Sequence, residues 1–372
     1  MRMQIRARRD YYNDIESGIN LKKKDMKTWS IPSLDKNIGE EVSAYLDTLT
    51  KPMGSLGKLE DLAVKIAEMT GQKFPDIKPP AAIVFAADHG ITAEGVSAFP
   101  KEVTAQMVTN FLEGGAAMNV FCRQINAEIS VVDVGVAEDI THDKLISRKI
   151  CHGTNNFLKQ DAMSEAEVEK ALMIGSEEAG NVIANGAKAL IVGEVGIGNT
   201  TSASALLAAI LDVPVEELTG PGTGLNAEKI IHKQQIIKQA IEKRQPDSSD
   251  PINLLKKLGG LEITAMVGAI LEAATNRIPI IVDGFICTVA AILAKQINEK
   301  ASDYMIAGHH SQEPGHLKAL KQLGKEPILD LNMRLGEGTG SAVAFPVVEA
   351  AINILNEMAT FSDAGVSEKD EE

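Results

Sequence analysis

Cysteine, tryptophan and long apolar runs are all scarce in this chain. Its 372 residues include three cysteines, one tryptophan and only 4% aromatic residues. Cys122, Cys151 and Cys287 stand far apart in or beside apolar stretches, and no CxxC pair occurs. Such spacing suits buried thiols in a reducing compartment better than a disulfide framework.

The chain also lacks a membrane span and a basic surface. No apolar run reaches the ~18 residues that a membrane helix requires, and charged residues fill the N-terminal stretch where a secretory signal would be hydrophobic. We therefore expect a cytoplasmic protein. The net charge of −14 disfavours nucleic acid as a partner, because binding a polyanion requires a basic surface. A small phosphate is compatible with this charge, because backbone amides and helix ends bind phosphate in acidic proteins too.

Several familiar catalytic motifs are absent. There is no GxxxxGK[ST] loop, which disfavours an ATPase, and no GxSxG turn, which disfavours a serine hydrolase. Residues 196–201 (GIGNTT) lack the third glycine of a dinucleotide-binding motif. His309, His310 and His316 match no common metal spacing, so we interpret them as structural histidines. We expect neither a metal nor a cofactor.

Six short apolar runs, each followed by a polar residue, predict the strands of a parallel sheet. They alternate with helical patterns, an arrangement in which helices cover both faces of the sheet. Ligands bind beyond the carboxyl ends of such strands, which makes Asp88, His89, Glu194, Asp283 and His309 candidate site residues. The predicted strands are 81–87, 129–132, 189–192, 278–282, 304–307 and 328–329.

Helical patterns without strands occupy both ends of the chain. Residues 35–70 carry two amphipathic patterns with a break at 51–54, and residues 340–358 carry a third. We expect these helices to pack together. The predicted segments are a poorly ordered extension at 1–30, a small helical domain from 31–75 and 341–360, an α/β catalytic domain at 76–340 and an acidic tail at 361–372.

Three glycine-rich turns precede helical patterns: 193–201 (GEVGIGNTT), 219–224 (TGPGTG) and 334–340 (RLGEGTG). Glycine lets the backbone approach a ligand closely, and the first N–H groups of the following helix point outward as anion donors. Glu194 and Glu337 add a carboxylate to two of the turns. The turns predict a site that binds an anion beside carboxylates. Taken alone, Glu337 is equally compatible with an acidic residue that caps a helix.

A series of longer motifs runs through the chain in order. They are 51–60 (KPMGSLGKLE), 87–91 (ADHGI), 99–107 (FPKEVTAQM), 192–202 (VGEVGIGNTTS), 219–224 (TGPGTG), 283–285 (DGF), 307–316 (AGHHSQEPGH) and 329–340 (LDLNMRLGEGTG). Together they resemble one enzyme family, the nicotinate-nucleotide:dimethylbenzimidazole phosphoribosyltransferases of cobalamin biosynthesis. The resemblance covers about residues 35–358. It implies a Rossmann-like parallel sheet, a small helical domain built from both chain ends, and a homodimer.

The resemblance also implies roles for individual residues. Glu337 corresponds to the general base, Glu194 and Lys233 to positions near the transferred ribose and phosphate, and Gln106 to the wall of the benzimidazole pocket. Asp283 and Ser311 lie in matching motifs and are expected to contact substrate. The phosphate is expected to be bound by Gly196, Gly198, Asn199, Thr200, Gly222, Thr223 and Gly224.

The implied reaction suits these residue types. The substrates would be nicotinate mononucleotide and dimethylbenzimidazole, whose N–H proton requires one carboxylate as base. A second carboxylate would stabilise positive charge on the ribose. Two alternatives stay open: a phosphoribosyl-binding protein without catalysis, and an enzyme of the same fold that acts on another nucleotide.

Overall fold

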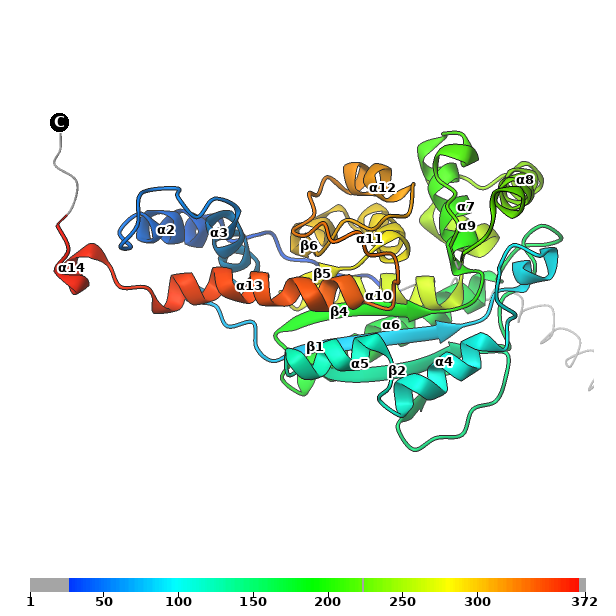
Figure 1. Ribbon diagram of the computed structural model, residues 1–372, viewed down its shortest axis with the longest axis horizontal. Helices are drawn as coiled ribbons and strands as arrows, with labels where there is room; N and C mark the ends of the chain where they lie inside the picture. The colour runs from blue at the N-terminus through cyan, green and yellow to red at the C-terminus, as the bar shows by residue number, and fades with distance from the viewer. Residues whose placement is uncertain (1–26, 223, 368–372) are drawn as a thin grey trace, which may run out of the picture.

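A parallel sheet of six strands organises the chain in this computed structural model, which describes residues 27–222 and 224–367 (Figure 1). The strand order is β3-β2-β1-β4-β5-β6, and every neighbouring pair is parallel. The predicted α/β class with a parallel sheet is confirmed. The strands are β1 (Pro80–Ala87), β2 (Glu128–Gly135), β3 (Leu145–Ser147), β4 (Ala189–Val195), β5 (Ile280–Val282) and β6 (Met305–Ala307).

The strand registers bring the polar residues at the strand ends to one edge of the sheet. Phe85 of β1 lies opposite Glu194 of β4, and Val282 of β5 lies opposite Ala307 of β6. The prediction of a strand at 328–329 is wrong, because Leu329 forms only an isolated bridge with His309. The sequence analysis also missed β3, whose residues are only partly buried or exposed and therefore carry a weak apolar signal.

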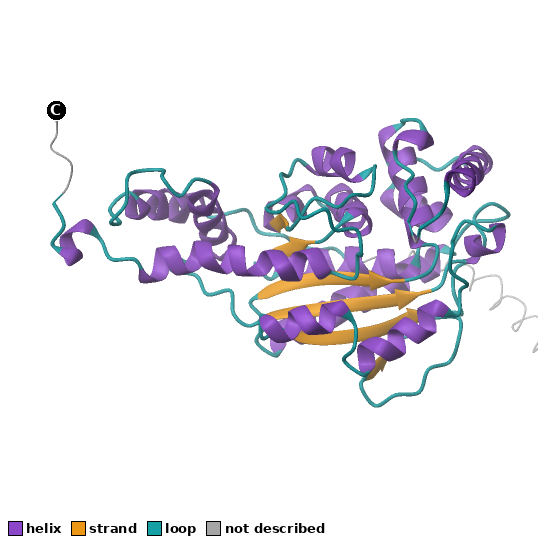
Figure 2. Cartoon of the chain, viewed as in Figure 1, coloured by secondary structure: helices purple, strands orange, loops and turns teal. Residues whose placement is uncertain are grey.

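Helices cover both faces of the sheet, as Figure 2 shows. In Figure 1, α4, α5 and α13 lie in front of the sheet and α6 and α10 lie behind it. Within the described ranges, no helix is long and apolar enough to cross a membrane. The helices are α2 (Lys36–Leu46), α3 (Lys58–Thr70), α4 (Val103–Leu112), α5 (Ala117–Gln124), α6 (Glu165–Ala184), α7 (Asn199–Leu211), α8 (Ala227–Arg244), α9 (Pro251–Leu258), α10 (Leu261–Thr275), α11 (Phe285–Ile297), α12 (His316–Leu323), α13 (Thr339–Glu357) and α14 (Phe361–Ala364), with short 3-10 turns η1 (Gly90–Glu94), η2 (Val215–Glu217) and η3 (Glu299–Tyr304).

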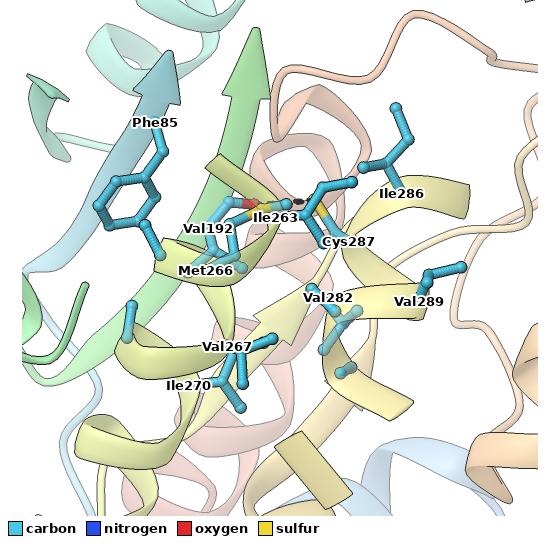
Figure 3. Close-up of a cluster of buried hydrophobic side chains, with 14 of the residues drawn as sticks. Phe85, Val192, Ile263, Met266, Val267, Ile270, Val282, Ile286, Cys287 and Val289 are labelled. Atoms are coloured by element: carbon cyan, nitrogen blue, oxygen red, sulfur yellow. Dashed lines mark hydrogen bonds between the residues drawn. The ribbon is translucent and has the colours of Figure 1, made fainter. Parts of the chain in front are cut away.

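Part of the main core lies between the central strands and helices α10 and α11 (Figure 3). Phe85, Val192 and Val282 enter it from β1, β4 and β5, and Met266 enters from α10. All four are fully buried, and burying such a side chain contributes about 1.5–3 kcal/mol. The Cys287 thiol of α11 donates to the carbonyl oxygen of Val192 at 3.4 Å. This packing fixes β4 and β5, whose ends carry Glu194 and Asp283.

A second, separate apolar cluster joins the two ends of the chain. Helices α2 and α3 pack beside the later part of α13, away from the sheet (Figure 1). The members of this cluster are Val42, Leu46, Leu49, Ala63, Ala67, Ala351 and Leu355. Early and late segments of the chain therefore pack against each other in space.

The expected boundaries of the two terminal segments need correction. Of the predicted extension 1–30, residues 27–30 belong to the folded part: Trp29 is 7% exposed in the main core, and Lys27 pairs with Glu272 at 2.6 Å. Burial of the Trp29 side chain places this segment in the folded part, although the residues before it are charged. At the other end, α14 forms within the predicted tail because the side chain of Thr360 accepts a hydrogen bond from the backbone of Asp363. Residues 1–26 and 368–372 lie outside the described residues.

Replacing Gly175 with alanine is expected to destabilise the fold. Helices α6 and α10 approach so closely there that an added Cβ would lie 1.7 Å from the carbonyl oxygen of Ala265. Overpacking of this kind costs about 1–3 kcal/mol. Gly180 on the same helix is the matched control, because its added Cβ meets only Glu272 Oε1 at 4.0 Å. Denaturant unfolding should show a clear loss for Gly175→Ala and none for Gly180→Ala; equal stability of the two variants would contradict the tight contact.

Candidate active site

A cavity of about 410 Å³ opens at the carboxyl edge of the sheet, a size typical of small-ligand sites. Its lining comes from the ends of β4 and β5, the start of α7, the start of α11 and the segment before α13. The polar and charged side chains that line it are Glu194, Asn199, Thr200, Asp283, Ser311, Glu313, Arg334 and Glu337.

Glu337 lies in a turn with an unusual backbone. Its φ is 65°, and flanking Gly336 and Gly338 have φ of 84° and 90°. The left-handed region costs a non-glycine residue about 1–2 kcal/mol, so the surroundings must enforce it. Two carboxylates do so: the Glu337 N–H donates to Glu194 Oε1 at 3.2 Å, and the Gly338 N–H donates to Asp283 Oδ2 at 3.1 Å. Asp283, which the sequence analysis expected only to contact substrate, thus holds the turn.

The surroundings of the Glu337 carboxylate favour proton uptake. The residue is 8% exposed, and its Oε2 has no hydrogen-bond partner. Burial, together with the nearby charge of Asp283, raises the pKa of Glu337 from 4.5 to about 7. A base is most effective when its pKa lies near the working pH. The helix-capping alternative fails, because Gly338 occupies the N-cap of α13 and no side chain caps that helix.

Glu194 is buried among other carboxylates. Its Oε1 accepts from the backbone of Glu337, and its Oε2 accepts from the side-chain amide of Asn199. Burial raises its pKa well above 4.5; the Glu337 N–H opposes this, and the charges of Glu262, Glu337 and Asp283 add to it. A cation bound beside Glu194 would favour its ionised form. The geometry therefore suits a positively charged ligand.

Positive charge gathers at the turn around Gly222. Lys233 is buried, and its Nζ donates to Thr200 Oγ1 at 2.9 Å, while Arg334 Nη1 donates to the carbonyl oxygen of Gly222 at 3.4 Å. Burial lowers the pKa of Lys233 to about 8, and Glu313 partly opposes this shift. Thr200 lies in the first turn of α7, where the helix dipole adds positive potential. These groups together can bind a phosphate.

An apolar wall faces the cavity from α4 and the segment before it. Phe99, Val103 and Met107 line the cavity, whereas Gln106 is exposed and does not. The expectation that Gln106 lines this pocket is therefore not met in the described chain. Residues four positions apart share one helix face, and that spacing could have identified Val103 and Met107, the two lining residues on α4. The other apolar lining residues are Val195, Ile197, Phe285, Ile286, Cys287 and Leu335.

The structure brings most of the predicted site residues together. Lys233 reaches the cavity through Thr200, and Gly198 is the N-cap of α7. Gly224 is exposed and does not line the cavity, and Thr223 lies outside the described residues. The predicted residues that do line it are Glu194, Gly196, Asn199, Thr200, Gly222, Asp283, Ser311 and Glu337.

Two charged residues of the cavity were missed by the sequence analysis. Glu313 lies two positions after Ser311, and Arg334 opens the turn that carries Glu337. Both lie inside motifs that the sequence analysis quoted. Their charge, within a glycine-rich or proline-containing segment, was the signal that could have identified them. Burial raises the pKa of Glu313, while the charges of Lys233 and Arg334 lower it.

The histidines near the cavity play different structural roles. His316 Nδ1 accepts from the backbone N–H of Ser311 at 2.7 Å, and its Nε2 lies 3.0 Å from Thr288 Oγ1. His309 Nε2 lies 3.4 Å from Asp283 Oδ1, and neither of its ring nitrogens has a hydrogen-bond partner. The described residues contain no group of three or more side chains arranged to hold a metal ion.

Comparison with known proteins identifies the class to which this fold and site belong. A family model described as Phosphoribosyltransferase matches residues 31–366. A relative from Halalkalibacterium halodurans is 52% identical over 91% of this chain and 95% of its own length. A relative from Geobacter sulfurreducens is 46% identical over 91% of this chain and 96% of its own length. The chain is therefore an enzyme of the phosphoribosyltransferase class.

The particular family follows from the names of these relatives. Both are named nicotinate-nucleotide–dimethylbenzimidazole phosphoribosyltransferase. The crystal structure of an enzyme with this name from Thermus thermophilus matches with a TM-score of 0.86 and 42% identity, and the match covers 90% of this chain and 100% of that one. This chain belongs to the nicotinate-nucleotide–dimethylbenzimidazole phosphoribosyltransferase family.

Proposed function

We propose that this chain transfers the phosphoribosyl group of nicotinate mononucleotide to 5,6-dimethylbenzimidazole, a step of cobalamin biosynthesis. The products are α-ribazole 5′-phosphate, nicotinate and one proton. The observation that carries the proposal is Glu337: a carboxylate with an unpartnered oxygen and a pKa of about 7 lines the cavity. The apolar wall suits the dimethylbenzimidazole ring, and the positive charge at the Gly222 turn suits the phosphate of the nucleotide.

The proposed mechanism needs one base and no acid. One ring nitrogen of the benzimidazole attacks the anomeric carbon, and its other nitrogen gives its proton to Glu337. The nicotinate ring is a pyridinium in the donor, so it leaves with the electrons of the broken bond and needs no proton. Attack from the face opposite the leaving group converts the β-nucleotide to an α-product. Glu194, once ionised, stabilises positive charge on the ribose.

The anion-binding groups place the donor. Lys233 and Arg334, with the N-terminus of α7, are proposed to bind the 5′-phosphate. Phe99, Val103 and Met107 are proposed to contact the acceptor ring, since they form an apolar surface beside the same cavity.

We also propose that the protein is a homodimer and is located in the cytoplasm. The family resemblance implies a homodimer, and two apolar side chains that line the cavity, Phe99 and Leu335, are 52% and 57% exposed. We propose that the unit of α2, α3 and α13 is the small domain of this family. The three cysteines are free thiols, as suits a cytoplasmic enzyme. Sedimentation measurements would test the dimer.

The activity itself has a direct test. The full chain is incubated with nicotinate mononucleotide, with and without 5,6-dimethylbenzimidazole, and nicotinate is quantified by chromatography. Nicotinate release should require the acceptor, and NMR should show an α-glycosidic product. Binding of the nucleotide without release of nicotinate would indicate a binding protein. Release with a different acceptor only would indicate another transferase.

A further inference from the structure

A buried histidine–glutamate pair that the proposed mechanism does not use lies behind the cavity. His89 follows β1, and Glu262 is in the first turn of α10; both side chains are fully buried. His89 Nε2 lies 2.6 Å from Glu262 Oε1. The other two polar atoms, His89 Nδ1 and Glu262 Oε2, have no hydrogen-bond partner. A buried pair of this kind adds little net stability, so stability alone gives no reason for it.

The pair supports the turn that forms the cavity edge. A Cβ added to Gly196 would lie 2.3 Å from the carbonyl oxygen of Ala87 and 3.6 Å from Glu262 Oε1. A Cβ added to Gly198 would lie 3.1 Å from the Cβ of His89. The turn from Gly196 to Gly198 therefore packs against both members of the pair. It leads directly into Asn199, whose amide binds Glu194.

Glu262 also acts on Glu194 through its charge. Three carboxylates raise the pKa of Glu194: Glu262 from α10, Glu337 from the turn before α13, and Asp283 from the end of β5. Cys287 of α11 adds no charge near Glu194, because burial raises the pKa of its thiol well above 9.0. Glu262 is the one of the three carboxylates that does not line the cavity. A ligand in the cavity would therefore not contact Glu262 directly.

We propose that His89 and Glu262 are positioning residues of this active site, which fix the Gly196–Gly198 turn and make the ionisation of Glu194 depend on a bound cation. The inference rests on the role proposed above for Glu194. In the empty site, the Glu262 charge favours protonated Glu194. The positively charged ring nitrogen of the donor offsets that charge, so Glu194 releases its proton to solvent water and becomes the carboxylate that the reaction needs. Nicotinate departs with a neutral ring nitrogen, which leaves no positive charge beside Glu194, so Glu194 takes back a proton from solvent water.

The test follows the carboxyl group of Glu194 directly. Infrared difference spectra between the wild type and Glu194→Gln, recorded over a pH series without substrates, give the pH midpoint at which Glu194 loses its proton. Glu262→Gln keeps the size of the side chain and an oxygen for His89, but removes the charge. The double variant Glu194→Gln/Glu262→Gln serves as the spectroscopic reference for Glu262→Gln. In Glu262→Gln, the pH midpoint of Glu194 should be about one pH unit lower than in the wild type. Glu262→Asp keeps the charge and should restore a midpoint close to that of the wild type.

Glu178→Gln is the matched control. Glu178 is also a buried carboxylate, at 5% exposure, but it lies on α6 and pairs with Arg148 at 3.4 Å. This variant should leave the Glu194 midpoint unchanged. An unchanged midpoint in Glu262→Gln would show that the pair is only structural. Should that variant not fold, the wild type still decides, because a midpoint near the ordinary value for glutamate would overturn the proposal.

These readings are separate from the test of the proposed function. The infrared midpoints need no turnover, so they remain valid if nicotinate mononucleotide is not a substrate. Addition of that nucleotide without acceptor should lower the Glu194 midpoint in the wild type. A nucleotide that is turned over but leaves the midpoint unchanged would support the function and contradict the cation dependence.

Discussion

Turnover by Glu337→Gln should fall about 10²–10⁴-fold, the usual contribution of a general base. Glutamine keeps the size of the side chain and can adopt the same left-handed backbone, but it cannot accept the benzimidazole proton. Binding of nicotinate mononucleotide should change little, because the groups proposed to bind its phosphate are Lys233, Arg334 and the start of α7. Steady-state kinetics with both substrates, together with equilibrium binding of the donor, would measure the two effects separately.

The pH dependence follows from the same carboxylate. With its pKa raised to about 7, Glu337 is a base only when ionised, so kcat should rise with pH and level off above pH 7. Stability should show the opposite trend. Protonated Glu337 stabilises the folded state below its unfolded pKa near 4.5, and this contribution is lost as pH rises through 7. The melting temperature of Glu337→Gln, relative to that of the wild type, should therefore rise between pH 5 and pH 8.

Acceptors of different acidity separate the two glutamates. An acceptor that is already deprotonated needs no base, so the defect of Glu337→Gln should shrink with it. The defect of Glu194→Gln should persist, because charge on the ribose develops with every acceptor. If both variants respond alike to acceptor acidity, or if Glu337→Gln unfolds, then Glu337 is not the base.

The sequence predicts the site well where strands and turns determine it. Apolar runs that end in Glu194 and Asp283 identified the cavity edge, because a buried parallel strand needs an unbroken apolar run and its end lies at the sheet edge. The glycines around Glu337 signalled a special turn. What the sequence could not show is that Asp283 and Glu194 hold that turn through backbone N–H groups, since those contacts join segments far apart in the chain.

Side-chain direction on a helix was less predictable. Gln106 and Met107 are neighbours in one motif, yet only Met107 lines the cavity. Successive residues on a helix point about 100° apart, and the motif alone does not determine which of the two directions faces the cavity. Trp29 shows the converse case, because one apolar residue in a charged stretch has no periodic pattern to reveal it.

Loss of the 5′-phosphate from the donor should reduce kcat/KM on the order of 10²–10³-fold. Each hydrogen bond to a charged group contributes about 1.5–3 kcal/mol, and the site offers Lys233, Arg334 and the N-terminus of α7. Nicotinate riboside lacks all of these contacts. Binding energy from a remote phosphate also helps to position the reacting carbon, so kcat should fall as well as affinity. Comparable turnover of riboside and nucleotide would contradict the phosphate site.

Lys233→Met assigns part of that difference to one side chain. The variant should lose about 10–10²-fold in kcat/KM for the nucleotide, as expected for one charge-assisted hydrogen bond, and almost nothing for the riboside. It should fold normally, since methionine fills the space of a buried lysine without burying a charge. Exposed Lys229, one turn earlier on α8, is the matched control, and Lys229→Met should behave as the wild type with both donors.

Because the pKa of Lys233 is lowered to about 8, KM for the nucleotide should rise above pH 8 in the wild type but not in Lys233→Met. The same rise in both would show that another group titrates, and that Lys233 does not bind the phosphate.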